Sequence, residues 1–305
     1  TIKPFVALAG LESGLRKPED RIYSSGEFFI PGQRRGYRDS HRGGHGSVDL
    51  SASIAESVNT YYYRLALDMG IEKFDAYMRR FGFGQPTGID LVGEFAGILP
   101  SPAWKRERFK MPWYAGETVI AGIGQGYWVV TPLQLAQGTA SLANGGMRIP
   151  LRLVSATRTG FDQPWQPLPK PAATSIGATP EHLQAIKTGM EATMHTRRGT
   201  GWAIAAGAPY LIAGKTGTVQ KISRRGNISV DPKNLPLHLR HQALFIGYAP
   251  ADDPKIAVVV VVEHGGYGAS SAGPIARKMM DAYLLKPEPA LPPPETEQKT
   301  ETGRD

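Results

Sequence analysis

The spacing of apolar residues along the chain predicts helices over much of its first two thirds. Residues 1–14 carry apolar side chains at helical spacing, and Pro4 falls in the first turn, where a helix tolerates it. Residues 18–50 form a long loop rich in Gly, Arg and Ser, with short extended pieces such as Glu27–Ile30, and residues 83–102 are turn-rich. The same helical spacing predicts four further helices, over Ser53–Met69, Ile71–Phe81, Thr131–Asn144 and His182–Met194.

The last third of the chain changes to a strand-like pattern. Ile256–Val262, the longest apolar stretch, is rich in β-branched residues and typical of a buried strand. An amphipathic helix is predicted over Ala272–Leu285, and the Pro, Glu, Lys and Thr content from Lys286 onward predicts a disordered tail over residues 286–305. Three strands separated by turn residues, which together predict an antiparallel meander, cover Tyr210–Gln220, Gln242–Ala249 and Lys255–Glu263.

Composition narrows the classes of protein that the chain can belong to. Its 305 residues include no cysteine, which excludes a disulfide framework and a zinc site with thiolate ligands. The hydrophobic content of 41% suffices for a sizeable core, and no apolar run reaches the roughly 18 residues of a membrane-spanning helix. The net charge of +8 is spread over several loops and forms no single recognisable module with interleaved aromatic residues, so a nucleic-acid surface is not predicted.

The most informative short motif is Lys215-Thr216-Gly217-Thr218, within the first predicted strand. Gly217 lets another backbone lie close alongside, because it has no Cβ atom. The Lys215 ammonium and the hydroxyls of Thr216 and Thr218 are suited to holding a carboxylate. We expect Lys215 to be exposed at a sheet edge, so that its replacement hardly changes folding.

Two further motifs precede this one. Ser57-Val58-Asn59 is an S-x-N triplet inside the helix predicted over Ser53–Met69, and Thr1-Ile2-Lys3-Pro4 matches an S-x-x-K motif cut one residue after its serine. Taken singly, each of the three motifs is more often a set of ordinary polar residues. In this order they are the signature set of the penicillin-recognising serine acyltransferases.

The wider sequence resembles the transpeptidase domain of class B penicillin-binding proteins, and among these the group that serves the rod-elongation machinery. The resemblance covers about residues 1–285. It is carried, beyond the three motifs, by Phe83–Leu91 with Gly93-Glu94 and Leu99–Ser101, by Ile123–Gly126 running into Thr131–Ala136, by Ala143–Gly146, and by Ala243–Pro250 followed by Glu263–Gly266.

The resemblance implies an α+β fold of the penicillin-binding-protein and serine β-lactamase kind. A mostly antiparallel sheet flanked by helices would adjoin a helical subdomain over about residues 15–200, with the active-site cleft between them and strand 214–220 at the sheet edge. The family's domain starts with a helix and two strands before S-x-x-K. The transpeptidase domain over residues 1–285 is therefore expected to be incomplete at its N-terminus, with the serine, a pedestal domain and a membrane anchor upstream of Thr1.

The resemblance also implies a role for each motif residue. Lys3 would be the general base for the serine, Ser57 a proton relay, and Asn59 the group that holds the substrate's amide side chain. The Thr218 N–H and the nucleophile's own N–H would form the oxyanion hole. The terminal carboxylate of the donor peptide would be bound by Lys215, Thr216, Gly217 and Thr218, and the catalytic set as a whole would be Lys3, Ser57, Asn59 and Lys215.

No cofactor is implied. The implied partners are peptidoglycan stem peptides, β-lactams, a membrane glycosyltransferase and other elongation-complex proteins, at the periplasmic face of the inner membrane. Because the mechanism needs no imidazole, we interpret three histidines as surface or interface residues, namely His195, His238 and His241.

A metal site in the loop before the S-x-N motif is a further hypothesis. Asp39 and His45 supply a carboxylate and an imidazole, which suit zinc. Some proteins that resemble this one place a metal in the equivalent loop. Two ligands do not make a site, so we favour hydrogen bonds that stabilise the loop, because the positions aligned to the remaining ligands are Ser24 or Ser25 and Val58.

The predicted function is a peptidoglycan DD-transpeptidase that cross-links stem peptides through a serine acyl-enzyme, is inhibited covalently by β-lactams and acts in cell-wall elongation. One alternative is a serine β-lactamase; no E-x-x-L-N pattern lies between the S-x-N and K-T-G motifs, which argues against the class A type. Another alternative is a non-catalytic binding domain of a cell-wall complex. A binding domain has no need for the complete motif set of Lys3, Ser57, Asn59 and Lys215.

Overall fold

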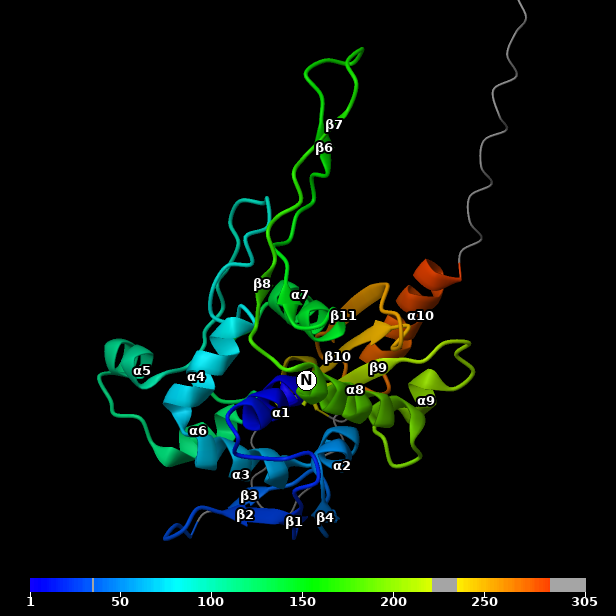
Figure 1. The fold of residues 1–305 in the computed structure, drawn as a ribbon. Helices are drawn as coiled ribbons and strands as arrows, with labels where there is room; N and C mark the ends of the chain where they lie inside the picture. The colour runs from blue at the N-terminus through cyan, green and yellow to red at the C-terminus, as the bar shows by residue number, and fades with distance from the viewer. Residues whose placement is uncertain (35, 221–234, 286–305) are drawn as a thin grey trace, which may run out of the picture.

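The chain folds around a central helix, α1 (Lys3–Glu12), which begins as the sequence predicts, with Pro4 in its first turn. The structure is a computed structural model that describes residues 1–34, 36–220 and 235–285. Figure 1 shows α1 in the middle of the molecule, between a helical region and a sheet. The predicted tail over residues 286–305 lies outside the described residues.

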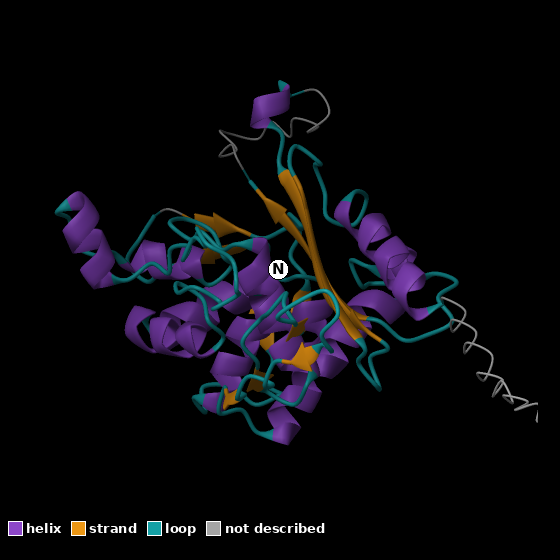
Figure 2. Cartoon of the chain, turned by 90° about the horizontal axis from the view of Figure 1, so that it is seen from above, coloured by secondary structure: helices purple, strands orange, loops and turns teal. Residues whose placement is uncertain are grey.

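The sheet is the antiparallel meander that the sequence predicts. Its strands lie in the order β11-β10-β9, and each neighbouring pair is antiparallel. Figure 2 shows the sheet between α10 and the helical region. The bounds are β9 (Ala213–Val219), β10 (Gln242–Ala249), β11 (Ile256–Val262) and α10 (Ala272–Leu284), with a 3₁₀ turn at Leu237–Leu239 before β10.

Side chains that alternate along β10 divide the core between the two faces of the sheet. Phe245 packs with Val258, Val260 and the buried side of α10 on one face, near the short helix α9 (Trp202–Ala205). Leu244 and Ile246 belong to the larger core on the other face, which α1 fills. The sheet therefore has helices on both faces, in an α+β arrangement.

The helical region differs from the prediction at the S-x-N motif. The predicted helix Ser53–Met69 is wrong as a single element, because it is two helices, α2 and α3, separated at Ser57. Ser57 adopts a left-handed φ of 58°, which no α-helix continues through. The other predicted helices are confirmed. Helices α5 and α6 were not predicted. The bounds of the helices in this region are α2 (Leu50–Ala55), α3 (Asn59–Met69), α4 (Ile71–Arg80), α5 (Pro102–Phe109), α6 (Ala115–Ala121), α7 (Pro132–Ala143) and α8 (Pro180–His195).

Short two-stranded sheets make up the remaining regular structure. In the loop before α2, β1 (Ile22–Ser24) pairs with β4 (Gly46–Val48) and β2 (Glu27–Phe29) pairs with β3 (Gly36–Arg38). Two further short sheets form an arm that extends away from the body in Figure 1. In these sheets, β5 (Met147–Arg148) pairs with β8 (Thr174–Ser175), and β6 (Ala156–Thr157) pairs with β7 (Gln166–Pro167).

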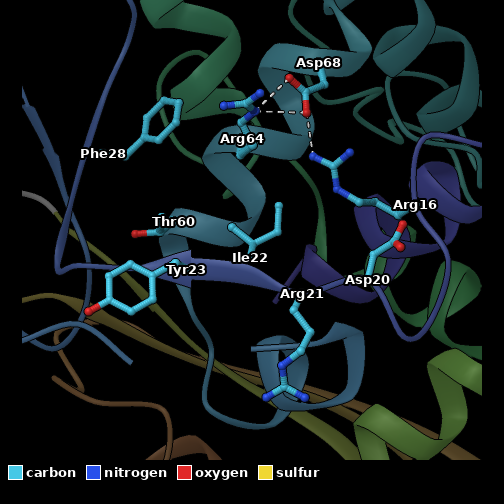
Figure 3. Close-up of a pocket in the computed structure, with 9 residues that line it drawn as sticks. All are labelled: Arg16, Asp20, Arg21, Ile22, Tyr23, Phe28, Thr60, Arg64 and Asp68. Carbon is cyan, nitrogen blue, oxygen red and sulfur yellow. Dashed lines mark hydrogen bonds and ion pairs between the residues drawn. The ribbon is translucent and has the colours of Figure 1, made fainter. Parts of the chain in front are cut away.

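An open pocket of about 500 Å³ lies between β1 and α3. Figure 3 shows two arginines, Arg16 and Arg64, turned toward Asp68 at one end of this pocket. Tyr23 and Phe28 lie at the other end. None of the residues with candidate chemistry lines it.

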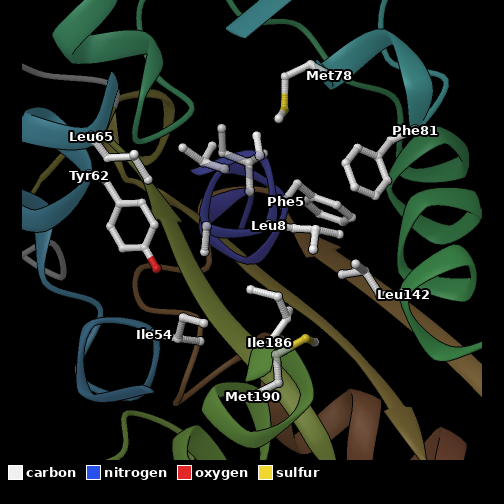
Figure 4. Packing of buried hydrophobic residues seen from close by; sticks show 14 of the residues in the cluster. Phe5, Leu8, Ile54, Tyr62, Leu65, Met78, Phe81, Leu142, Ile186 and Met190 are labelled. Carbon is white, nitrogen blue, oxygen red and sulfur yellow. The ribbon is translucent and has the colours of Figure 1, made fainter. Parts of the chain in front are cut away.

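Between Pro4 and Leu11, α1 carries only apolar residues on all its sides, and a helix of that kind must be enclosed on every side. Every residue from Lys3 to Leu11 is buried. Figure 4 shows Phe5 and Leu8 of α1 encircled by side chains from α2, α3, α4, α7 and α8 and from Phe81, which directly follows α4: Ile54, Tyr62, Leu65, Met78, Phe81, Leu142, Ile186 and Met190. This enclosure fixes the first turn of α1 at the junction of α3, α8 and β9.

No helix in the described ranges is long and apolar enough to cross a membrane.

Candidate active site

The first turn of α1 brings the S-x-x-K and S-x-N motifs together. The buried Lys3 donates from Nζ to the Ser57 carbonyl at 2.6 Å, to Ser57 Oγ at 3.1 Å and to Asn59 Oδ1 at 2.7 Å. Ser57 and Asn59 both lie more than 50 positions from Lys3 in the chain. One ammonium thus organises both polar residues of the S-x-N triplet.

The S-x-N triplet lies in the break between α2 and α3, and not inside a helix. Ser57 is left-handed and Val58 extended, so α3 starts at Asn59. In a continuous helix, the Ser57 carbonyl would accept the backbone bond of the residue four positions later. In the break, the carbonyl and hydroxyl of Ser57 both face Lys3.

Burial prepares Lys3 to act as a base. Burial lowers the pKa of Lys3 from 10.5 to about 7, and the negative charge of Asp39 opposes that shift. A substantial fraction of Lys3 is therefore neutral at neutral pH, as a general base requires. The ring of Tyr62, whose centroid lies 5.3 Å from Lys3 Nζ, covers the ammonium on another side.

Lys215 is fully buried, and the expectation that it is exposed was wrong. β9 is the edge strand of the described sheet, but an edge is open only within the plane of a sheet, and α8 packs against β9. Burial, reinforced by the charge of Lys3, lowers the pKa of Lys215 well below its usual range. Its Nζ donates to the Thr216 carbonyl at 3.0 Å, whereas Ser57 Oγ accepts from Lys3 Nζ.

Gly217 permits the close approach that the sequence predicts. A Cβ atom at this position would lie 2.6 Å from Thr1 Cγ2 and 3.0 Å from Thr1 N. The backbone just before α1 thus lies directly against β9. A hollow at this contact is lined by residues of four segments, including Thr1, Ile2, Gly124, Gln125, Gly217 and Thr218. Of the predicted site residues, Gly217 and Thr218 line this hollow, and none lines the larger pocket beside Asp68.

Thr200 and the turn at Gly124 belong to the site but were missed from the sequence. Thr200 Oγ1 lies 2.7 Å from Thr216 Oγ1, which puts a further hydroxyl beside the K-T-G strand. Gly124 has a φ of +75°, and a Cβ there would lie 2.7 Å from Ile2 Cγ1. The resemblance over Ile123–Gly126 was the signal for this turn, whereas no motif marked Thr200.

Asp39 is engaged in hydrogen bonds with its own protein. Its carboxylate accepts from Ser24 Oγ and from the backbone N–H groups of Ser40, Asn59 and Thr60. His45 Nε2 lies 3.7 Å from Asp39 Oδ1, and His45 Nδ1 pairs with Glu56 Oε2 at 3.0 Å. Within the described ranges, no three or more His, Cys, Asp or Glu side chains are grouped to hold a metal ion.

The three histidines that the sequence analysis interpreted as surface or interface residues differ in exposure. His195 and His238 are exposed, and His195 Nε2 accepts from the Ile212 N–H at 3.0 Å. His241 is 8% exposed, so it is a buried residue and not a surface one.

Comparisons with known proteins identify relatives of this chain. Peptidoglycan D,D-transpeptidase MrdA of Haemophilus influenzae is 40% identical over 287 residues, which make up 93% of this chain and 44% of MrdA. The crystal structure of Pseudomonas aeruginosa PBP2 in complex with WCK 5153 is similar with a TM-score of 0.83 at 41% identity, over 97% of this chain and 63% of that one.

A complex between PBP2 and MreC from Helicobacter pylori gives a TM-score of 0.79 at 29% identity, over 93% of this chain and 49% of that one. The chain thus spans about half or less of the length of the curated relatives it matches. The family profile described as penicillin binding protein transpeptidase domain matches residues 1–281. This chain therefore belongs to the penicillin-binding protein transpeptidase domain family.

Proposed function

We propose that the protein is a peptidoglycan DD-transpeptidase that works through an acyl-enzyme on the serine that the S-x-x-K spacing places directly before Thr1. The observation that carries this proposal is the buried set of Lys3, Ser57 and Asn59, held beside β9 at the first turn of α1. A lysine in this environment is a base at neutral pH. The name of the Haemophilus relative supports the reaction class.

The site residues would act in two transfers. Neutral Lys3 takes the serine proton while the serine oxygen attacks the carbonyl of the penultimate D-alanine, and Ser57 passes the proton to the departing D-alanine amine. An acceptor amine then attacks the ester carbonyl, its proton moves to Lys3, and the serine leaves with a proton returned from the same group. The N–H groups of Thr218 and of the serine would stabilise the oxyanion in both steps.

The K-T-G strand would align the donor peptide. The outer edge of β9 in the described sheet can pair with an extended peptide, as in other complexes in which a peptide adds to a sheet edge. The hydroxyls of Thr200 and Thr216 lie together beside that strand. With Thr218 and Lys215 they form the group that would receive the terminal carboxylate.

The setting of the reaction follows from the relatives. The Helicobacter pylori PBP2 is described in complex with MreC. We propose that this chain likewise works with elongation-complex proteins, including a membrane glycosyltransferase, at the periplasmic face of the inner membrane.

Covalent labelling tests the reaction class. Full-length protein incubated with a fluorescent penicillin should carry a covalent label on a denaturing gel, and the label should persist for minutes or longer. A transpeptidase lacks a base positioned to deacylate with water, so its acyl-enzyme is long-lived. Loss of label within seconds would indicate a serine β-lactamase, and no label at all would indicate a non-catalytic domain.

Variants of the K-T-G strand test the carboxylate contact. Thr218→Val should slow acylation by roughly one to two orders of magnitude, because a hydrogen bond to a charged group contributes about 1.5–3 kcal/mol. Lys215→Met should slow it further, since attraction for the carboxylate and proton transfer are both lost. Second-order acylation rates measure both effects.

Thermal unfolding separates these losses from loss of the fold. Thr218 is partly exposed, so its variant should keep the wild-type midpoint. Lys215→Met keeps the side-chain volume and removes a buried ammonium, so its midpoint should not fall. Wild-type acylation by Lys215→Met, or a loss explained by unfolding, would contradict the role assigned to this strand.

A further inference from the structure

The helix that carries Asn59 begins without a local cap. Val58 is the N-cap residue of α3, and its apolar side chain cannot accept a hydrogen bond from the first-turn N–H groups. The first N–H groups of any helix have no partner within the helix. Here they are at the catalytic site, where a loosely held first turn would move Asn59.

Asp39 supplies the missing cap from 20 residues upstream. Its Oδ1 accepts from the Asn59 N–H at 2.8 Å and its Oδ2 from the Thr60 N–H at 2.9 Å. The carboxylate is itself fixed by the Ser40 N–H at 2.7 Å and by Ser24 Oγ at 3.0 Å, and its side chain is fully buried. Burial alone would raise the pKa of Asp39, but these hydrogen bonds outweigh it and hold the pKa below its usual range.

Arg38, at the end of β3 and next to Asp39, sets the direction of the Asn59 side-chain amide. The Arg38 carbonyl accepts from Asn59 Nδ2 at 3.4 Å, which turns Oδ1 toward Lys3 Nζ at 2.7 Å. The backbone and the side chain of Asn59 are therefore both held by residues 38 and 39. A carboxylate is required for the backbone part, because an amide would put an NH₂ group against one of the two N–H donors.

Asp39 also acts on Lys3 through its charge. Lys3 is faced by Lys215 from β9, by the Tyr62 ring from α3 and by the Asp39 carboxylate from the loop after β3. Burial lowers the pKa of Lys3, and among these groups the negative charge of Asp39 raises it. Removing that charge should therefore make Lys3 a weaker base.

We propose that Asp39 is a positioning residue of the reaction: its buried carboxylate clamps the first turn of α3 and so holds Asn59 and Lys3 in register. This inference rests on the proposed acyl-transfer function for its consequence, but the clamp itself is independent of it. Nothing in the clamp requires a metal ion.

Amide hydrogen exchange in the wild-type protein tests the clamp without any substitution. The Asn59 and Thr60 amides should be protected, although they lie in the first turn of a helix. The matched reference is α4, whose N-cap Gly70 offers no side chain, so the first-turn amides of Glu72 and Lys73 should exchange fast. Equal, fast exchange at both helix starts would overturn the clamp, even in a protein that labels fully with penicillin.

Substitution tests the link to the reaction. In full-length protein, Asp39→Asn should slow acylation about ten- to a hundred-fold, on the scale of lost charge-assisted hydrogen bonds. The pH below which acylation declines should also move down, because the pKa of Lys3 falls when the Asp39 charge is removed. A purely structural role would lower the folded fraction and leave that pH in place.

Asp49→Asn is the control variant. Asp49 caps α2 by accepting from the Ala52 N–H at 2.9 Å and does not face Lys3. It should keep both the wild-type rate and the wild-type pH profile. An unchanged pH profile in folded Asp39→Asn would overturn the positioning role, whereas a wild-type protein that forms no acyl-enzyme would overturn the proposed function instead.

Discussion

Lys3→Met should slow acylation by penicillin about 10²- to 10⁴-fold, the range of a lost general base, in a protein that still folds. Lys3 is the only group among the site residues that donates to both Ser57 and Asn59, and burial brings its pKa to about 7. Methionine fills a similar volume but takes no proton. Rates measured across pH should lose the ionisation that the wild-type protein shows near neutrality.

The stability of the same variant should depend on pH in a defined direction. Because the folded pKa of about 7 lies below the ordinary 10.5, the unfolded chain binds more protons between these values. The penalty on the wild-type fold is full below about pH 7 and fades as pH rises toward 10.5. The variant's advantage in free energy of unfolding should therefore shrink by several kcal/mol over that range, at about 1.36 kcal/mol per pKa unit.

Lys105→Met provides the comparison. Lys105 is equally buried, but its Nζ bonds both carboxylate oxygens of Glu117, at 2.5 and 2.7 Å. Removing it leaves Glu117 without its partner, so this variant should be less stable and still acylate normally. If Lys3→Met acylates at the wild-type rate, another group is the base.

The second large effect is expected for Gly217→Ala, which should slow acylation by about 10²- to 10³-fold, the range for a damaged oxyanion hole. The new methyl group would meet the Thr1 backbone at 3.0 Å. β9 has little room to withdraw, because Gly268 approaches the Gly217 and Leu244 backbones so closely that a Cβ there would also collide. The strand and the start of α1 must therefore separate at the point where the oxyanion would bind.

Gly160→Ala is the matched control, since the nearest atom to a Cβ at Gly160 is a side-chain carbon 3.7 Å away. It should leave acylation and the unfolding midpoint unchanged. A Gly217→Ala protein with a wild-type acylation rate would show that the contact between Thr1 and β9 has no part in the reaction.

Sequence periodicity predicted the elements whose burial is strongly patterned. The helix from Lys3, the helix over Thr131–Asn144 and the three-stranded meander were found because apolar residues recur at one spacing over their whole length. α5, α6 and α9 were missed. α5 has one buried residue, Lys105, and carries almost no apolar stripe, and α6 and α9 are only seven and four residues long.

The catalytic geometry was less accessible from local sequence. The break at Ser57 depends on a left-handed residue that is not glycine, and residue type alone does not signal it. The burial of Lys215 depends on which helices cover one face of β9, a tertiary fact. The cap from Asp39 joins residues 20 positions apart, whereas capping rules consider only immediate neighbours.

The enclosure of α1 has a consequence for how the protein folds. The first turn of α1 and Thr1 just before it contact segments that stretch from Ser57 to Gly217, so the contacts that assemble the site close very long loops in the chain. Contacts of this kind form late and slowly, because loop-closure entropy must be overcome before they stabilise anything. Under the proposed acyl-transfer function, we therefore expect an intermediate that leaves α1 unenclosed not to react with penicillin, so that the yield of label during refolding counts only molecules that have completed the fold.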